Sequence, residues 1–351
     1  MGICSSFLSS CVHRRASLTF KDKVINFAVA LLLPLAALGE ENISEEERLE
    51  RLRSCRAKGA KLTHSENESA IRDLWVEEEI ELPRLFGDGD PVRALVYTPI
   101  SKRTADLPLV IWMHGGGLNI MDFRNKSGSD IFTQLANVED APQFCWASVE
   151  YRLAPEAQFP APVDDVVSAF LAFMEPARAG SYGYCPTKVG LSGISAGGYL
   201  AVHAARKLAE AGKVPAFLAP LYPMVDPLMD TPSWKLFGDL PICPSPWLRQ
   251  SWQWTLAGSK EGAKPDEGRL KEASLLQAGL AIPGLKGLRT MLVLGRFDPM
   301  FNEGEALGER FIEAGLQVQL VSGYGSHTMA HKVDEAAGKL AKQWWLQTLS
   351  L

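Results

Sequence analysis

A serine surrounded by small residues is the strongest chemical signal in the sequence. Residues 193–197 read GISAG and match the pattern G-x-S-x-G, in which a serine sits on a tight turn between a strand and a helix. Small neighbours are required because larger side chains would collide at this turn. An apolar run at Lys188–Ser192 precedes the serine, and a helix-forming stretch at Ala196–Ala211 follows it. The pattern predicts that Ser195 is a nucleophile, although taken alone it also fits a glycine-rich turn with an idle serine.

A glycine-rich loop with the sequence HGGG, residues 114–117, follows another apolar run. Consecutive glycines let backbone N–H groups point at a developing oxyanion with no Cβ in the way. The loop predicts that Gly115 and Gly116 donate to that oxyanion, together with the backbone N–H of Ala196. The histidine that opens the loop, His114, is interpreted as a structural residue that hydrogen-bonds it.

An acid and a base are expected after the serine, in the order Ser, Asp or Glu, His, at the ends of later strands. Asp298 follows the apolar run Met291–Leu294, and His327 follows the run Val318–Val321. His331 competes with His327 for the role of base. However, His331 falls within the predicted final helix, whereas His327 lies in the loop before it. The sequence therefore predicts Asp298 as the acid and His327 as the base.

These residues together predict acyl transfer. His327 would take the proton from Ser195 as the serine attacks an ester carbonyl, and Asp298 would orient and stabilise the imidazolium. This chemistry needs no metal and no organic cofactor. No H-E-x-x-H motif or other cluster of metal ligands accompanies the histidines. Neither a metal site nor a cofactor is therefore expected.

Apolar runs of strand length alternate with helical stretches through most of the chain, which indicates an α/β fold with a mostly parallel sheet covered on both faces. The predicted strands are Val76–Leu82, Val92–Tyr97, Leu109–Met113, Phe144–Val149, Lys188–Ser192, Ala216–Leu221, Met291–Leu294 and Val318–Val321. The predicted helices among and after them are Val163–Met174, Ala196–Ala211, Asn302–Ala314 and Thr328–Leu349. A capping box at residues 44–47 predicts a further helix that ends near Gly59. The aromatic insertion at about 226–287 breaks the alternation and is interpreted as either a lid or a subdomain, in a position that lies over the active site in this fold class.

The composition is that of a globular protein. The chain has 351 residues, of which 46% are hydrophobic and 22% charged, and this argues against disorder, collagen and coiled coil. The net charge of −5 argues against nucleic acid or an anionic membrane as the main partner. The six cysteines are scattered without zinc-ligand spacing, so buried or free thiols are expected rather than disulfides. Length alone suggests two domains, but the motifs favour one hydrolase domain at 61–351 after an N-terminal extension at 1–60.

The N-terminal extension carries conflicting targeting signals. Gly2 fits the myristoylation pattern M-G-x-x-x-[ST], and the nearby Cys4 could take a second acyl chain. A basic stretch and an apolar run at 24–39 instead fit a signal peptide, a short signal anchor or a hydrophobic helix packed on the domain. A cytoplasmic location is favoured, with membrane association or the secretory route as alternatives, and the oligomeric state is left open, a homodimer included. N-x-S sequons, which matter only on the secretory route, begin at Asn42, Asn67 and Asn125.

Six sequence blocks occur in an order that resembles the hormone-sensitive-lipase-like carboxylesterases, a family with arylacetamide-deacetylase-like members. The blocks are HGGG (114–117), EYRLAPE (150–156), FPAPVDD (159–165), GISAGG (193–198), DPMFNEGE (298–305) and GSH (325–327). They cover roughly residues 75–335. The resemblance implies an α/β-hydrolase fold, with a mostly parallel eight-stranded sheet, helices on both faces and a helical cap. The cap would consist of the N-terminal residues and the insertion after the sixth strand.

Carried over by position, the resemblance implies Ser195 as nucleophile, Asp298 as acid and His327 as base, acting on short- to medium-chain or aryl carboxylic esters. It also implies that Tyr151, Arg152, Pro155, Glu156 and Asp165 brace the oxyanion loop. Three residues depart from the usual pattern and are expected at the rim of the substrate pocket: Leu118, Ile194 and Tyr199. Trp247 and Trp252 of the insertion are further pocket candidates, although these aromatics also suit a small core within the lid itself.

Two rival functions remain open at this point. A plant hormone receptor family shares this fold and these blocks but has lost the histidine of the triad, so His327 argues against a receptor. An enzyme with the same triad could instead act on an amide, a lactone or a peptide bond.

Overall fold

The computed structural model describes residues 35–63, 68–101 and 106–350. The predictions on Gly2, on Cys4, on the apolar run before residue 35 and on the sequon at Asn67 lie outside these residues. The described chain begins with the 3-10 helix η2 (Leu35–Gly39) and continues into α3 (Glu45–Thr63). Ser44 caps α3 by accepting a hydrogen bond from the backbone N–H of Glu47 at 3.2 Å, as the capping box predicts.

Eight strands form one sheet in the order β1-β2-β4-β3-β5-β6-β7-β8. They are β1 (Trp75–Leu82), β2 (Val92–Pro99), β3 (Leu107–Met113), β4 (Cys145–Val149), β5 (Tyr184–Ile194), β6 (Leu218–Leu221), β7 (Arg289–Gly295) and β8 (Gln317–Gly323). The β1–β2 and β2–β4 pairs are antiparallel, and the remaining pairs are parallel. The predicted mostly parallel eight-stranded sheet is therefore confirmed, and each predicted strand overlaps an observed one.

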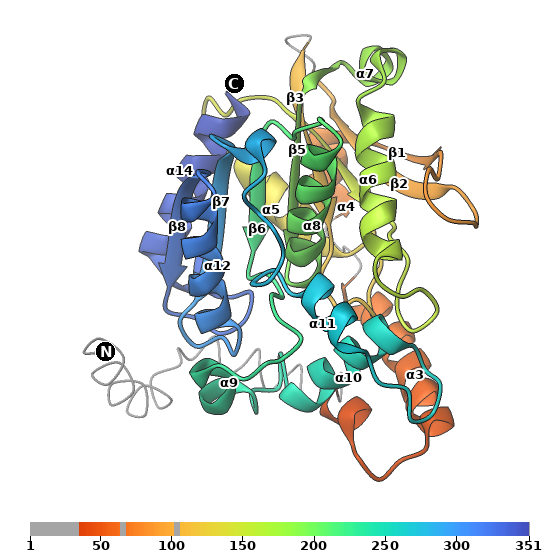
Figure 1. The fold of residues 1–351 in the computed structure, drawn as a ribbon. Helices are drawn as coiled ribbons and strands as arrows, with labels where there is room; N and C mark the ends of the chain where they lie inside the picture. Colours follow the sequence, from red (N-terminus) through yellow and green to blue (C-terminus); the bar gives the residue numbers. More distant parts are fainter. Residues whose placement is uncertain (1–34, 64–67, 102–105, 351) are drawn as a thin grey trace.

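Helices cover both faces of this sheet (Figure 1). One face carries α6 (Ala161–Phe173), α8 (Ala196–Glu210) and α12 (Phe301–Glu313), and the other carries α4 (Glu68–Leu74), α5 (Lys126–Ala136) and α14 (Glu335–Leu349). Strand β3 shows why two cores form. Ile111 and Met113 lie in the core beneath α8, whereas Val110 and Trp112 lie in the core beneath α5 and α14, because successive side chains of a strand point to opposite faces.

The C-terminal helical stretch differs from the prediction of one continuous helix over Thr328–Leu349. It is divided into α13 (Ala330–Val333) and α14, with Asp334 between them. The Asp334 carboxylate accepts hydrogen bonds from the N–H groups of Ala336 and Ala337, each at 3.1 Å. An aspartate in this role starts a new helix and interrupts the preceding one. The helices α4, α5 and α7 (Pro176–Tyr182) were not predicted from the sequence.

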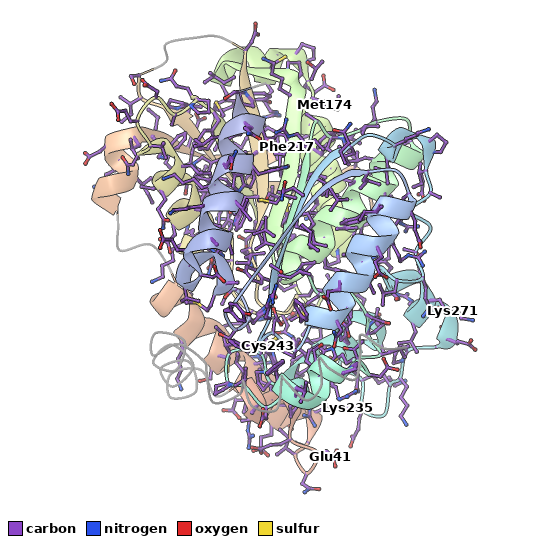
Figure 2. The ribbon with its side chains drawn as sticks, turned by 90° about the vertical axis from the view of Figure 1, so that its left-hand side faces the viewer. Glu41, Met174, Phe217, Lys235, Cys243 and Lys271 are labelled. Atoms are coloured by element: carbon purple, nitrogen blue, oxygen red, sulfur yellow. The ribbon has the colours of Figure 1, made fainter. Side chains whose placement is uncertain are left out.

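The insertion between β6 and β7 lies across one end of the sheet together with α3 (Figure 1). It contains α9 (Pro232–Phe237), α10 (Ser245–Ala257), α11 (Glu267–Ala273) and η3 (Pro283–Leu285). Trp254 of α10 donates from Nε1 to the Glu45 carboxylate of α3 at 2.5 Å. A Cβ at Gly39 would lie 2.1 Å from the Pro246 backbone, so η2 packs directly on α10. We call η2, α3, α9, α10 and α11 the cap layer. Figure 2 labels Lys235, which is exposed on α9, and Cys243, which is buried in the segment between α9 and α10.

Three further expectations concern the described residues. No helix in this part of the chain is long and apolar enough to cross a membrane. The cysteines described by the structure, Cys55, Cys145, Cys185 and Cys243, form no disulfide with one another. The sequon residue Asn125 is buried and caps α5, because its side chain accepts a hydrogen bond from the N–H of Ser127 at 2.9 Å.

Candidate active site

Ser195 lies on a sharp turn between β5 and α8, with φ of 58° and ψ of −118°. Residues other than glycine seldom adopt a positive φ, and such strain is concentrated at functional sites. A Cβ at Gly193 would lie 2.4 Å from the backbone of Gly197, and a Cβ at Gly197 would lie 2.0 Å from the Met113 carbonyl oxygen. Glycine is therefore required at both positions, which is the physical basis of the GISAG pattern.

Three side chains form a hydrogen-bonded chain after the carboxyl ends of β5, β7 and β8. His327 Nε2 lies 2.9 Å from Ser195 Oγ, and His327 Nδ1 lies 2.7 Å from Asp298 Oδ2. The other oxygen of the Asp298 carboxylate accepts from the backbone N–H of Met300 at 2.9 Å. The Nδ1–H group of His327 donates a hydrogen bond to Asp298. Nε2 is then unprotonated and can accept a hydrogen bond from the Ser195 hydroxyl. The exposed fractions of Ser195, Asp298 and His327 are 7%, 2% and 4%, so little water reaches the chain.

The loops that carry Asp298 and His327 touch each other directly. The backbone N–H of Phe297 donates to the carbonyl oxygen of Gly325 at 3.1 Å. Gly295 permits this approach, because a Cβ there would lie 2.7 Å from the same carbonyl oxygen. Backbone contacts between the two loops therefore set the separation of the carboxylate and the imidazole.

His331, the other candidate base in the sequence, makes different contacts. Its backbone N–H donates to the Tyr222 hydroxyl at 2.8 Å, and its Nδ1 lies 2.8 Å from the same oxygen. Burial lowers the pKa of His331 to about 3, so the ring is neutral near pH 7 and Nδ1 accepts the hydroxyl proton. Tyr222 directly follows β6, and its ring centroid lies 6.1 Å from that of His327. His331 therefore links the segment after His327 to the strand beside β5.

The glycine loop that follows β3 lies against the serine turn. A Cβ at Gly115 would lie 3.3 Å from Ser195 Cβ. Gly116 has φ of 107°, and a Cβ there would lie 2.3 Å from the carbonyl oxygen of Ile120. Both glycines line the cavity in front of Ser195. Ala196 is the first residue of α8, where backbone N–H groups have no partner within the helix.

His114 and Tyr151 brace this loop. His114 Nδ1 donates to the carbonyl oxygen of Gly115 at 2.7 Å, and the Tyr151 hydroxyl donates to the carbonyl oxygen of His114 at 2.8 Å. The two rings are stacked with their centroids 4.3 Å apart. Burial lowers the pKa of His114 to about 4, so its imidazole is neutral at working pH and places no positive charge beside the loop.

The segment after β4 is held by a buried carboxylate. Asp165 is fully buried and accepts hydrogen bonds from the backbone N–H of Arg152 at 2.9 Å and from Arg152 Nη2 at 2.8 Å. The guanidinium of Arg84 also bonds to Asp165. Glu156, in the same segment, pairs with Arg56 of α3 at 2.7 Å. These contacts connect the segment both to the core and to the cap layer.

A cavity of about 240 Å³ opens in front of Ser195. Its apolar lining comes from the cap layer and its surroundings, the glycine loop and the residue before the serine: Leu35, Ile120, Met121, Ile194, Ile242 and Trp247. Its polar lining comes from the start of α5 and from the His327 segment: Asn125, Lys126, Ser127, Asp130, Thr328 and Lys332. The cavity is therefore apolar on one side and charged on the other.

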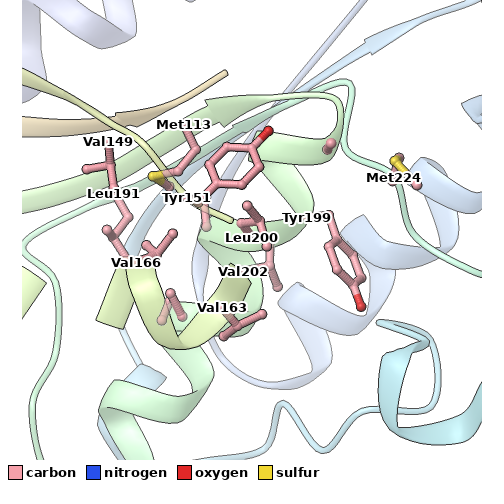
Figure 3. Close-up of a cluster of buried hydrophobic side chains, with 14 of the residues drawn as sticks. Met113, Val149, Tyr151, Val163, Val166, Leu191, Tyr199, Leu200, Val202 and Met224 are labelled. Carbon is pink, nitrogen blue, oxygen red and sulfur yellow. The ribbon is translucent and has the colours of Figure 1, made fainter. Parts of the chain in front are cut away.

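The predicted pocket residues divide into two groups. Ile194 and Trp247 line the cavity, but Leu118, Tyr199 and Trp252 do not and lie in the hydrophobic core instead. Tyr199 packs edge-on against Trp252 with ring centroids 5.2 Å apart, and Figure 3 shows it within a buried cluster. The prediction was wrong for these three. Tyr199 lies one turn of α8 after Ser195, which carries it into the core, and Leu118 and Trp252 are packed in the same core.

Sequence reasoning missed the polar side of the cavity. Lys126 and Asp130 escaped notice because α5 was not predicted, and Lys332 because its segment was assigned to one long helix. A signal was available, since Asn125 is a favoured N-cap residue and precedes an amphipathic run. Among the described residues, no group of three or more His, Cys, Asp or Glu side chains could hold a metal ion.

A serine on a strained strand-to-helix turn, joined to a histidine and an aspartate from later strand ends of a mostly parallel sheet, defines a protein of the α/β-hydrolase class. A family model described as alpha/beta hydrolase fold matches residues 110–331. The chain belongs to this family, and the resemblance to the hormone-sensitive-lipase-like group is confirmed.

Several known proteins with hydrolase names are similar to this chain. Neutral cholesterol ester hydrolase 1 of Bos taurus is 29% identical over 179 residues, which are 49% of this chain and 42% of that protein. Arylacetamide deacetylase of Oryctolagus cuniculus is 31% identical over 180 residues, 50% of this chain and 44% of that protein. The matches thus span less than half the length of these two relatives. A solved structure titled "Bacterial Heroin Esterase" superimposes with a TM-score of 0.70 at 29% identity, covering 85% of this chain and 91% of that one.

Proposed function

We propose that this protein is a serine hydrolase that cleaves short- to medium-chain or aryl carboxylic esters through an acyl-enzyme. The observation that carries the proposal is the connected path from Ser195 Oγ to His327 at 2.9 Å and from His327 to Asp298 at 2.7 Å, at the mouth of a cavity. Two of the relatives, a cholesterol ester hydrolase and a heroin esterase, have names that support the same reaction class.

In the proposed reaction, Ser195 Oγ attacks the ester carbonyl carbon while His327 Nε2 takes the hydroxyl proton. Asp298 holds the Nδ1 proton and stabilises the imidazolium. The imidazolium then gives its proton to the departing alcohol, which leaves an acyl group on Ser195. Water repeats the sequence, with His327 again as the base, and releases the carboxylic acid and the free serine.

The negative charge that forms on the carbonyl oxygen requires donors that are already in place. We assign this role to the backbone N–H groups of Gly115, Gly116 and Ala196. A single donor of this kind contributes about 3 kcal/mol to transition-state stabilisation. The Gly115 carbonyl oxygen is held by His114, so the peptide plane that carries the next N–H is oriented before substrate binds.

We also assign the cap layer to the substrate side of the enzyme. Ile242 and Trp247 of the 226–287 insertion, together with Leu35 of η2, close the apolar side of the cavity. The N-terminal extension thus contributes to the cap through η2 and α3. A cavity of about 240 Å³ is small and favours short acyl groups, so turnover should decline from butyrate to longer p-nitrophenyl esters.

The test combines a fluorophosphonate probe with p-nitrophenyl butyrate. We expect the wild type to be labelled and to turn over the ester, and Ser195→Ala to lose both. Ser192→Ala is the matched control, because Ser192 is buried three residues earlier on β5 and its hydroxyl donates to the Ala219 carbonyl oxygen. Wild type with neither labelling nor turnover would refute the proposal and favour a receptor. Labelling without ester turnover would point to an amide, lactone or peptide substrate.

A further inference from the structure

The backbone that follows the HGGG motif is held in an unusual conformation. Gly116 and Gly117 have φ of 107° and 61°, and Leu118, which is not a glycine, has φ of 65°. Three consecutive residues with positive φ persist only where the surrounding structure holds them. One support is the N–H of Ala154, which donates to the carbonyl oxygen of Leu118 at 2.8 Å. The next residue, Asn119, supplies the others.

The side chain of Asn119 is fully buried and uses both ends of its amide on helix α10 of the cap layer. Its Nδ2 donates to Ser251 Oγ at 2.5 Å, and its Oδ1 accepts from Trp247 Nε1 at 3.2 Å. Ser251 in turn donates to the carbonyl oxygen of Trp247 at 2.9 Å, one helical turn away. An amide fits here because the position needs one donor and one acceptor on the same side chain.

The backbone of Asn119 makes two further contacts. Its N–H donates to the carbonyl oxygen of Gly116 at 3.1 Å, which holds the turn of the oxyanion loop. Its carbonyl oxygen accepts from Arg56 Nε of α3 at 2.7 Å, and Arg56 also pairs with Glu156 at 2.7 Å. One buried residue therefore contacts the loop, α10 and α3 at the same time.

Trp247, which lies on α10 of the cap layer, also contacts the glycine loop directly. Its ring lies against Gly117, where an added Cβ would be 2.8 Å from Trp247 Cζ2, and the same ring lines the cavity. A substrate in the cavity would contact a side chain whose indole N–H is hydrogen-bonded to Asn119 and whose ring packs against Gly117. Through these two contacts, Trp247 connects the wall of the cavity to the loop that would stabilise the oxyanion.

We propose that Asn119 is a positioning residue that couples the docking of α10 and α3 to the geometry of the backbone donors at Gly115 and Gly116. This inference rests on the proposed function, because it concerns the oxyanion of that reaction. The coupling makes the docked cap a requirement for fast acyl transfer and not only a wall of the pocket.

The experiment compares wild type with Asn119→Leu, which keeps the approximate size of the side chain but removes both polar ends. The measurement is kcat and KM for p-nitrophenyl butyrate, with kcat expressed per site that a fluorophosphonate can label, so that a misfolded fraction does not count. We expect kcat to fall on the order of 10-fold or more, below the 10²- to 10³-fold cost of removing a whole oxyanion donor, with KM within ~3-fold. Ser251→Ala should show a smaller fall, and the double variant should match Asn119→Leu, because Asn119→Leu already removes the hydrogen bond to Ser251.

Trp254→Phe is the matched control on the same helix. Trp254 also donates from its indole N–H, but its partner is Glu45 of α3, so its loss leaves the contacts of Asn119 intact. We expect its kcat per labelled site to stay within ~2-fold of wild type. A folded Asn119→Leu variant with wild-type kcat would overturn this inference and leave the proposed function intact. If that variant does not fold, a wild-type kcat for Ser251→Ala would overturn the inference instead. Wild type with neither label nor turnover refutes the proposed function first.

Discussion

The orientation of the His327 segment depends on one side-chain group, the hydroxyl of Tyr222. This hydroxyl accepts from the backbone N–H of His331 at 2.8 Å and donates to His331 Nδ1 at 2.8 Å. His331 lies in α13, four residues after His327, and Tyr222 directly follows β6. The substitution Tyr222→Phe keeps the ring, which packs near His327, and removes only this oxygen.

The expected cost of Tyr222→Phe follows from the two groups that lose their partner. A neutral hydrogen bond contributes about 1 kcal/mol net, and a buried polar group left without a partner costs about 1–3 kcal/mol. His331 Nδ1 and the His331 backbone N–H both lose the hydroxyl, so we expect a total of about 2–6 kcal/mol. If about 1.4 kcal/mol of this total is added to the activation free energy because His327 is misplaced, kcat falls about 10-fold. The remainder should lower the Tm by a few degrees.

The assay measures kcat per fluorophosphonate-labelled site and the Tm for the same preparations. Tyr199→Phe is the matched control, because Tyr199 is also fully buried but its hydroxyl has no hydrogen-bond partner among the described residues. We expect that control to keep both kcat and Tm. Should Tyr222→Phe also keep both, the hydroxyl would not hold the histidine segment, and the reasoning from its two hydrogen bonds would be refuted.

Three further outcomes follow from buried groups. Asp165→Asn should cost about 3–5 kcal/mol in urea unfolding, because it leaves the buried guanidinium of Arg84, as well as Arg152, beside a neutral amide; an unchanged unfolding midpoint would contradict this. Burial raises the pKa of Glu303 well above its usual range, so the unfolded chain loses this proton more readily, and wild-type stability falls as pH rises above about 4.3. Glu303→Gln lacks this titration, so its stability relative to wild type should rise as the pH rises above about 4.3, and a difference that stays constant with pH would show that Glu303 ionises freely. Gly197→Ala should abolish turnover, because its Cβ would lie 2.0 Å from the Met113 carbonyl oxygen, and an active variant would show that the turn can relax.

The order of secondary structure and the spacing of the chemical residues could be read from the chain. Buried strands of a parallel sheet are continuous apolar runs, so Leu109–Met113 and Met291–Leu294 are visible without any knowledge of their neighbours. Glycines are demanded by close backbone approaches, which makes the GISAG and HGGG blocks local signals. His327 was preferred over His331 because one lies in a loop and the other in a helix, and the structure places His327, not His331, beside Ser195.

The lining of the pocket and its supports could not be read in this way. Whether Tyr199 faces a cavity or the core depends on the packing of α8 against α10, and helical spacing alone suits either outcome. Asn119 stands in the sequence as an ordinary polar residue, and its partners Arg56 and Ser251 are 63 and 132 positions away.

The residue types and their order along the chain therefore decide which chemistry is available, since a nucleophile, an acid, a base and a glycine loop each have a local pattern. Tertiary packing decides which side chains meet the substrate and which hold the loop in place. The physical reason is that directions of side chains and contacts over long sequence separations arise only when helices and sheet pack, and cap contacts such as that between Trp247 and Asn119 have no local sequence pattern.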